Sequence, residues 1–208
     1  FAEYYFIDLD KTNIDALRGR ALELAQDRVA PHRIHCYNAD CNDVLLTHVF
    51  PRVRFEDYRR ALCLLDPFGL HLDWKVIAAA GQMKSVEIFL NFPIHDINRN
   101  ALPRDRTRAE KVQVMRLTKL WGDDSWADVA YSKDENLFGF ELKVESGRLA
   151  EAFRDRLRTV AGFRHVPEPV LLRNTKNAPM FYLFFAAHNP IAGHIVSGIF
   201  KKYRSPGR

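Results

Sequence analysis

Long hydrophobic runs are absent from this 208-residue sequence, and no stretch approaches the length needed to cross a membrane. No secretory leader is visible either, and the first residue is Phe1 rather than methionine, so we expect residues to precede this sequence in the protein. Cysteine is scarce, with Cys36, Cys41 and Cys63 forming an odd and scattered set. This argues against a disulfide framework and favours a reducing, cytoplasmic environment.

Zinc binding is an alternative use for two of these cysteines, because histidine and cysteine gather between positions 32 and 41. The candidate ligands are His32, His35, Cys36 and Cys41. Their spacing matches none of the usual zinc-binding pairs, so partly buried thiols are the preferred interpretation and no metal site is predicted.

The composition is that of a globular protein, with 47% hydrophobic and 27% charged residues. The length is sufficient for one α/β domain with a sizeable core. Lysine and arginine number 31 against 26 acidic residues, which gives a net charge of +5. This modest excess favours a nucleic acid or another anionic partner.

Apolar runs alternate with helical patterns in the first half of the chain, which predicts a parallel α/β sheet. The predicted strands cover residues 4–8, 33–37, 61–65 and 85–93. Each carries a polar side chain at or shortly after its carboxyl end, namely Asp8, Asp40, Asp66 and Asn91. Because the carboxyl ends of parallel strands meet at one edge of a sheet, we expect these side chains to form a site.

Between these strands, the sequence predicts a helix after Asp10, in which Thr12 and Asp15 have capping-box spacing. Short helices are predicted at 44–49 and 55–60, and a longer one begins at Asp73. The run 61–65 has the character of a parallel strand buried on both faces, which delivers Asp66 to the edge of the sheet.

Residues 98–142 differ from their surroundings and are predicted to form a basic, largely helical insertion in an α/β domain made of 1–97 and 143–208. Candidate contacts to a polyanion here are Arg104, Arg106 and Arg108, and a solvated surface helix is the equally favoured alternative. An amphipathic helix is predicted at 147–160 and an antiparallel hairpin at 166–187. A last helix begins at Asn189-Pro190 and carries isoleucines on one face, at Ile191, Ile195 and Ile199.

Two enzyme classes fit the first polar loop, Asp8-Leu9-Asp10-Lys11-Thr12. One is the haloacid-dehalogenase-like phosphatases, in which Asp8 would attack phosphate and Asp10 would act as acid and base. Gly122-Asp123-Asp124 would then supply metal-binding acids, but the preceding segment is helical and basic in pattern instead of a buried strand. The preferred class is the S-adenosylmethionine-dependent methyltransferases, where acids after successive strands bind the ribose, the adenine and the reacting groups.

Three segments resemble the three-Cys-motif partner (TcmP) family, which is methyltransferase-like. They are Phe6-Ile7-Asp8, the run ALCLLDPFGL at 61–70 followed by Trp74, and the run PMFYLFFAAHNP at 179–190. The resemblance implies a Rossmann-like class I methyltransferase fold with a C-terminal antiparallel hairpin. It also implies a first strand and an acidic, glycine-rich loop that would lie upstream of Tyr4, between the strands that end at Asp8 and Asp66.

The resemblance implies S-adenosylmethionine as cofactor, and a three-Cys-motif protein, similar to radical-SAM proteins, as partner. The cofactor-binding residues it implies are Asp8, Asp40, Cys41 and Asp66. The catalytic loop is Asp66, Pro67 and Phe68, which resembles the D-P-P-Y/F loop of amino-methyltransferases and predicts a nucleotide-like substrate. Phe68 would stack on a base, or would pack into the core in the alternative interpretation. Further residues on the substrate side are Gly69, Phe92 and Pro93. A non-catalytic nucleic-acid-binding or partner subunit is the competing class.

Overall fold

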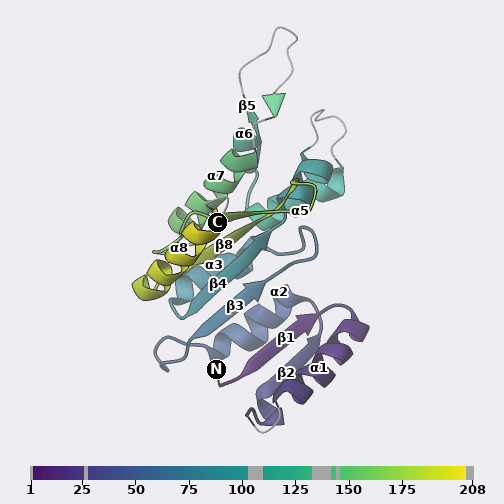
Figure 1. The fold of residues 1–208 in the computed structure, drawn as a ribbon, viewed down its shortest axis with the longest axis vertical. Coiled ribbons are helices and arrows are strands. Elements are labelled where there is room, and N and C mark those ends of the chain that lie inside the picture. Colours follow the sequence, from purple (N-terminus) through teal and green to yellow (C-terminus); the bar gives the residue numbers. More distant parts are fainter. Residues whose placement is uncertain (1, 26–27, 103–109, 133–141, 144–145, 205–208) are drawn as a thin grey trace. The chain divides into compact units, whose positions relative to one another are not determined.

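The structure is a computed structural model that describes residues 2–25, 28–102, 110–132, 142–143 and 146–204 (Figure 1). The chain forms two compact units, an N-terminal unit of Phe1–Val53 and a C-terminal unit of Arg54–Arg208. No helix within the described ranges is both long and apolar enough to span a bilayer.

A parallel pair of strands forms the centre of the N-terminal unit. Strand β1 (Tyr4–Asp8) pairs with β2 (Ile34–Asn38) along its whole length, and helix α1 (Lys11–Ala25) connects them. The remaining elements are short: η1 (Pro31–Arg33), α2 (Cys41–Val44), the π-helical turn η2 (Leu45–Val49) and the 3₁₀ turn η3 (Phe50–Arg52). The predicted strands at 4–8 and 33–37 and the helical segment at 44–49 are therefore confirmed.

The C-terminal unit contains a mixed sheet with the strand order β3-β4-β8-β7. Strands β3 (Ala61–Leu65) and β4 (Val86–Phe92) are parallel. Strand β8 (Pro179–Ala186) runs antiparallel to β4 and pairs on its other side with β7 (Val170–Arg173), also antiparallel. The predicted C-terminal hairpin is confirmed, and its second strand lies inside the sheet next to the last parallel strand.

Helices and short turns complete the C-terminal unit. They are α3 (Trp74–Met83), α4 (Ile94–Asp96), the π-helical turn η4 (Ile97–Ala101), α5 (Lys111–Trp121), α6 (Trp126–Ala130), α7 (Ser146–Thr159) and α8 (Pro190–Arg204). A two-residue antiparallel pair joins β5 (Tyr131–Ser132) to β6 (Leu142–Lys143). The predicted helix at 55–60 is wrong, because this segment is a turn in which Tyr58 has a φ of 57°.

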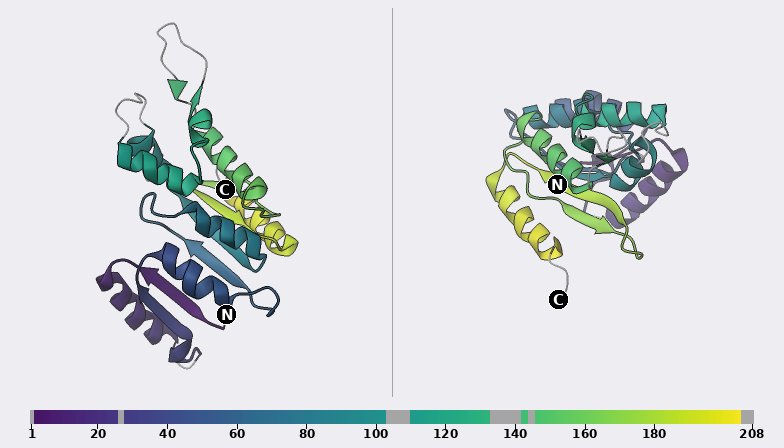
Figure 2. Two further views of the ribbon diagram at one scale, coloured as in Figure 1. Left: turned by 180° about the vertical axis from the view of Figure 1, so that it is seen from behind. Right: turned by 90° about the horizontal axis from the view of Figure 1, so that it is seen from above.

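The two faces of the four-stranded sheet pack against different helices (Figure 2). On one face, Phe92 and Phe184 contact Phe153 of α7, with ring centroids 4.5 and 5.5 Å away. On the other face, Phe89 and Phe185 belong to a cluster that includes Phe200 of α8. Alternating side chains along β4 and β8 thus supply both cores.

One expectation about burial is wrong. Strand β3 is not buried on both faces, since Leu64 is 74% exposed while its neighbours Cys63 and Leu65 are buried. The isoleucines of α8 are all exposed, with Ile191 68% exposed, because the helix packs on the sheet through Val196 and Phe200.

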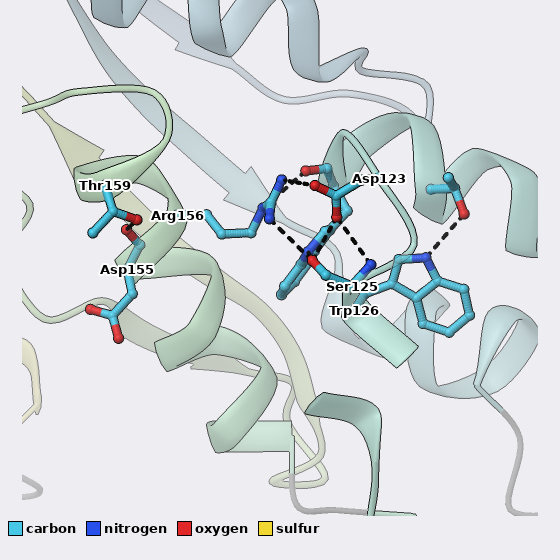
Figure 3. Close-up of polar contacts among 8 residues, drawn as sticks. Asp123, Ser125, Trp126, Asp155, Arg156 and Thr159 are labelled. Atoms are coloured by element: carbon cyan, nitrogen blue, oxygen red, sulfur yellow. Dashed lines mark hydrogen bonds and ion pairs between the residues drawn. The ribbon is translucent and has the colours of Figure 1, made fainter. Parts of the chain in front are cut away.

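Arg156 of α7 bonds to the end of α5 and to the turn that leads into α6 (Figure 3). The guanidinium of Arg156 donates to the carbonyl of Trp121, to the hydroxyl of Ser125 and to the carboxylate of Asp123, at 3.1, 3.1 and 2.8 Å. Gly122 ends α5 in the left-handed region with a φ of 101°, where a Cβ would lie 2.5 Å from the ring of Trp74. This contact geometry requires glycine at that position.

Candidate functional site

The loops that follow β1 and β2 meet at the carboxyl edge of the N-terminal unit. The amide of Asn38 donates to the backbone carbonyls of Asp8 and Leu9, at 3.2 and 2.7 Å. The backbone N–H of Ala39 also donates to the carbonyl of Asp8, at 3.1 Å. The expected convergence of these two strand ends is therefore present within this unit.

The carboxylate of Asp8 has local hydrogen-bond partners. One oxygen accepts from the backbone N–H of Asp10 at 2.7 Å, and the other accepts from the amide of Asn13 at 3.2 Å. Each carboxylate oxygen has further acceptor capacity, so Asp8 can still accept hydrogen bonds from a ligand. Beside it lies a surface hollow of about 320 Å³, which is also lined by Asn13, Ala16, Leu17 and Arg20.

Asp10 caps helix α1, because its carboxylate accepts from the backbone N–H of Thr12 at 2.7 Å. The predicted capping box of Thr12 and Asp15 is therefore wrong, and Asp15 instead pairs with Lys11 at 2.5 Å. Because capping already accounts for Asp10, its position in this loop is no evidence for the phosphatase hypothesis.

Asp40 is likewise a capping residue. Its carboxylate accepts from the backbone N–H and the side-chain amide of Asn42, at 2.8 and 2.9 Å, at the start of α2. Asp40 is exposed, and Cys41, the first residue of α2, is half-buried. Both predicted cofactor residues therefore lie at the same edge as Asp8, but the position of Asp40 is explained by the helix it caps.

The carboxyl edge of the C-terminal unit brings Asp66 and Asn91 together. The Asn91 amide donates to the Asp66 carboxylate at 2.9 Å, across the parallel pair β3 and β4. The amide oxygen of Asn91 is buried and has no hydrogen-bond partner in the part of the chain that the structure describes. The exposed carboxylate of Asp66 thus keeps further acceptor capacity at this edge, whereas the unsatisfied amide oxygen of Asn91 lies below the surface.

The loop after Asp66 projects an aromatic ring into solvent. Phe68 is 91% exposed and its ring lies 6.4 Å from that of His71. Gly69 has a φ of 56°, a backbone conformation that favours glycine, and a Cβ there would lie 3.5 Å from the carboxylate of Asp96. The alternative interpretation of Phe68 as a core residue is wrong, and half-buried Pro67 supports the loop.

Phe92 and Pro93 need a correction as substrate residues, because both are buried. Phe92 is 0% exposed and its ring packs 4.5 Å from Phe153 and 5.7 Å from Phe184. A side chain with no accessible surface contributes to the core and offers no contact to a substrate. Their place at the end of an apolar strand does not indicate whether their side chains face the core or a ligand.

The predicted polyanion contacts Arg104, Arg106 and Arg108 lie outside the described residues. The helix that follows them, α5, buries Leu117, Leu120 and Trp121 and exposes Lys111 and Lys119. This helix is thus amphipathic, as the sequence pattern predicts for part of the basic segment.

The cysteines and acids that were considered as metal ligands have other surroundings in the structure. Cys36, Cys41 and Cys63 form no disulfide bond, and burial raises the pKa of Cys63 to about 12. Within the described residues, no group of three or more His, Cys, Asp or Glu side chains is arranged to hold a metal ion. Asp123, which the phosphatase hypothesis would use as a metal ligand, is instead bound to Arg156 and Ser125.

Comparison with known proteins identifies no relatives: no family model matches the chain, and no curated protein or solved structure is significantly similar to it.

Proposed function

We propose that the chain is an S-adenosylmethionine-dependent methyltransferase of the three-Cys-motif partner type, with a Rossmann-like class I fold. The observation that supports this best is the order β3-β4-β8-β7, in which an antiparallel strand lies beside the last parallel one. The resemblance implies this arrangement. It also implies a strand between those ending at Asp8 and Asp66, and within the described residues β1 and β3 each pair with only one other strand.

Under this proposal, the edge at Asp8 and Asp40 binds the nucleoside part of the cofactor. Asp8 borders a hollow and retains acceptor capacity, so it is suited to the ribose hydroxyls. No metal is required, because methyl transfer from a sulfonium depends mainly on alignment of donor and nucleophile. In the reaction, the methyl carbon–sulfur bond breaks as the bond to the nucleophile forms, and the nucleophile loses a proton.

Asp66, Asn91 and Phe68 would serve the substrate. The exposed carboxylate of Asp66, which the Asn91 amide holds in place, suits an amino group, since an amino group donates hydrogen bonds. The exposed ring of Phe68 suits stacking on a base of a nucleotide-like substrate. A non-catalytic partner subunit is the second candidate, and the local hydrogen bonds of Asp8 and Asp40 favour it, because they give both carboxylates a structural reason.

Calorimetry with S-adenosylmethionine on the full-length protein separates the two. We expect binding, and we expect Asp8→Asn to weaken it at least tenfold, since asparagine keeps the bond from Asp10 but lacks the second acceptor oxygen. Asp15→Asn, on the adjacent helix, is the matched control and should leave affinity unchanged. Absence of binding by the unmodified full-length protein would rule out the enzyme. Stable complex formation with a three-Cys-motif protein would then favour the partner subunit.

The role of Asp66 is tested on turnover. We expect Asp66→Asn to lower the methyl-transfer rate at least a hundredfold with little change in cofactor affinity, whereas the exposed Asp124→Asn should change neither. Equal rates in the two variants would remove Asp66 from the proposed site while leaving the cofactor assignment standing.

A further inference from the structure

A basic hollow of about 440 Å³ lies in the C-terminal unit. It is formed by the second half of α7, the segment after it and the first turns of α8. The polar side chains that line it are Arg154, Arg158, Arg164, His165, His194 and Ser197, and none of its lining residues is acidic. Three guanidinium groups around one hollow repel each other unless an anion offsets their charge.

The sheet places this hollow at the opposite edge from Asp66. Strand β8 runs antiparallel to β4, so its last residues lie where β3 and β4 begin. There His165 and Ala187 exchange backbone hydrogen bonds of 2.9 and 3.0 Å, next to the start of α8. The hollow is thus separate from the proposed methyl-transfer site, and the inference below does not depend on that proposal.

Close packing brings the first turns of α8 against His165. A Cβ on Gly193 would lie 2.7 Å from the Cβ of His165, so the helix can approach this closely only with glycine there. The positive end of the 15-residue helix therefore borders the hollow and adds to its positive potential. Burial lowers the pKa of the neighbouring His188, and the charge of Arg164 adds to that lowering.

The three arginines of the hollow differ in the hydrogen bonds and ion pairs that they form within the protein. Arg154 is fixed, since it donates to the carbonyl of Val166 at 3.0 Å and to Glu151 at 3.2 Å. Arg158 reaches Asp155 only at 4.0 Å, and both side chains are more than half exposed, so this pair is weak. Arg164 is exposed and has no hydrogen bond or ion pair within the described ranges. Two guanidinium groups are thus free to bind a ligand.

From this geometry we propose that the hollow binds a phosphate group, carried by a nucleotide or by a nucleic-acid backbone. Guanidinium groups present parallel N–H donors that match the oxygens of a phosphate, and the Ser197 hydroxyl and the two histidines add donors. The volume lies within the range of small-ligand sites, whereas the polar lining does not suit an apolar ligand.

Binding measurements on the full-length protein test this with two probes, pyrophosphate and a labelled single-stranded 12-mer. The test variant is Arg158→Gln/Arg164→Gln. The control is Arg148→Gln/Lys176→Gln, which removes the same charge from exposed sites in the same unit. The affinity of the test variant should be at least tenfold lower, since each charged hydrogen bond that is lost lowers affinity about tenfold or more. The affinity of the control variant should change less than twofold.

The probes identify the source of the phosphate. If the test variant loses affinity for pyrophosphate but not for the 12-mer, the ligand is a small phosphate ester. If the test variant also loses affinity for the 12-mer, the ligand is a nucleic-acid backbone. In that case the slope of log affinity against log salt concentration should fall by roughly one for each arginine removed. Both arginines are exposed, so thermal denaturation should show both variants to be folded. Equal affinities of the test and control variants for both probes would overturn the proposal.

Discussion

Replacing Arg156 by methionine should destabilise the C-terminal unit by about 2–3 kcal/mol. The Arg156 side chain is only 14% exposed; methionine keeps its apolar stem and removes the guanidinium donors of Arg156 that Figure 3 shows. Most of this loss in stability comes from the carbonyl of Trp121 at the end of α5, because it would no longer accept the hydrogen bond that Arg156 donates at 3.1 Å. The ion pair with Asp123 contributes less, because the Asp123 side chain is about half exposed and solvent screens it.

Arg158→Met is the matched control, since it lies on the same helix and is more than half exposed. Its stability should stay within about 0.5 kcal/mol of the unmodified protein. Arg156→Lys should recover less than half of the loss, because one ammonium group cannot reproduce the three directed bonds of the guanidinium.

Urea denaturation followed by tryptophan fluorescence measures these differences. The three tryptophans of the chain are Trp74, Trp121 and Trp126. All three belong to the C-terminal unit, so the signal reports the unfolding of that unit. Two of them stack near Arg156, with the guanidinium carbon 5.0 Å from the ring of Trp74 and 5.5 Å from that of Trp121. If Arg156→Met were no less stable than Arg158→Met, the contacts of Arg156 would not hold these helices together.

Two further predictions concern stability. Gly81→Ala should lower the free energy of unfolding by about 2 kcal/mol or more, because the new Cβ would lie 2.1 Å from the backbone oxygen of Ala161. Gly198→Ala should raise it by about 0.5–1 kcal/mol, since no atom lies within 4 Å of the new Cβ. Equal urea midpoints of the two variants would contradict this. Hydrogen bonds from Ser125, followed by the charge of Arg156, lower the pKa of Asp123, so its contribution is present above the unfolded pKa of about 4 and is lost as pH falls through the lower folded pKa. The stability difference between the unmodified protein and Asp123→Asn should accordingly be constant from pH 5 to 7 and shrink in acid, and a difference that grew on acidification would refute the assignment.

The elements of the fold follow largely from local sequence patterns. The alternating apolar runs and the hairpin residues identified β1, β2, β3, β4, β7 and β8, because these patterns depend on the backbone period of each element. Asn189 followed by Pro190 located the start of α8, where Asn189 accepts from the N–H of Ile191 at 2.9 Å. The turn at 55–60 was missed, since its apolar residues repeat without a core to bury them.

The direction in which a side chain points was much less predictable. Helix α8 carries two apolar rows, and only the contact of Gly193 with His165 and the packing of Phe200 decide which row is buried. Phe92 ends strand β4 and Phe68 lies shortly after strand β3, yet Phe68 is 91% exposed and Phe92 is fully buried. The surroundings that decide this come from α7 and β8, far away in sequence.

The sequence by itself determined that polar side chains follow successive strands, because strand ends and turn residues are local properties. Only the tertiary structure decided which distant groups come together. It joins Asp66 to Asn91 across two strands, and it gathers arginines from α7 and the segment after it into a basic hollow beside α8. These outcomes depend on distances between segments remote in the chain, and no local pattern encodes those distances.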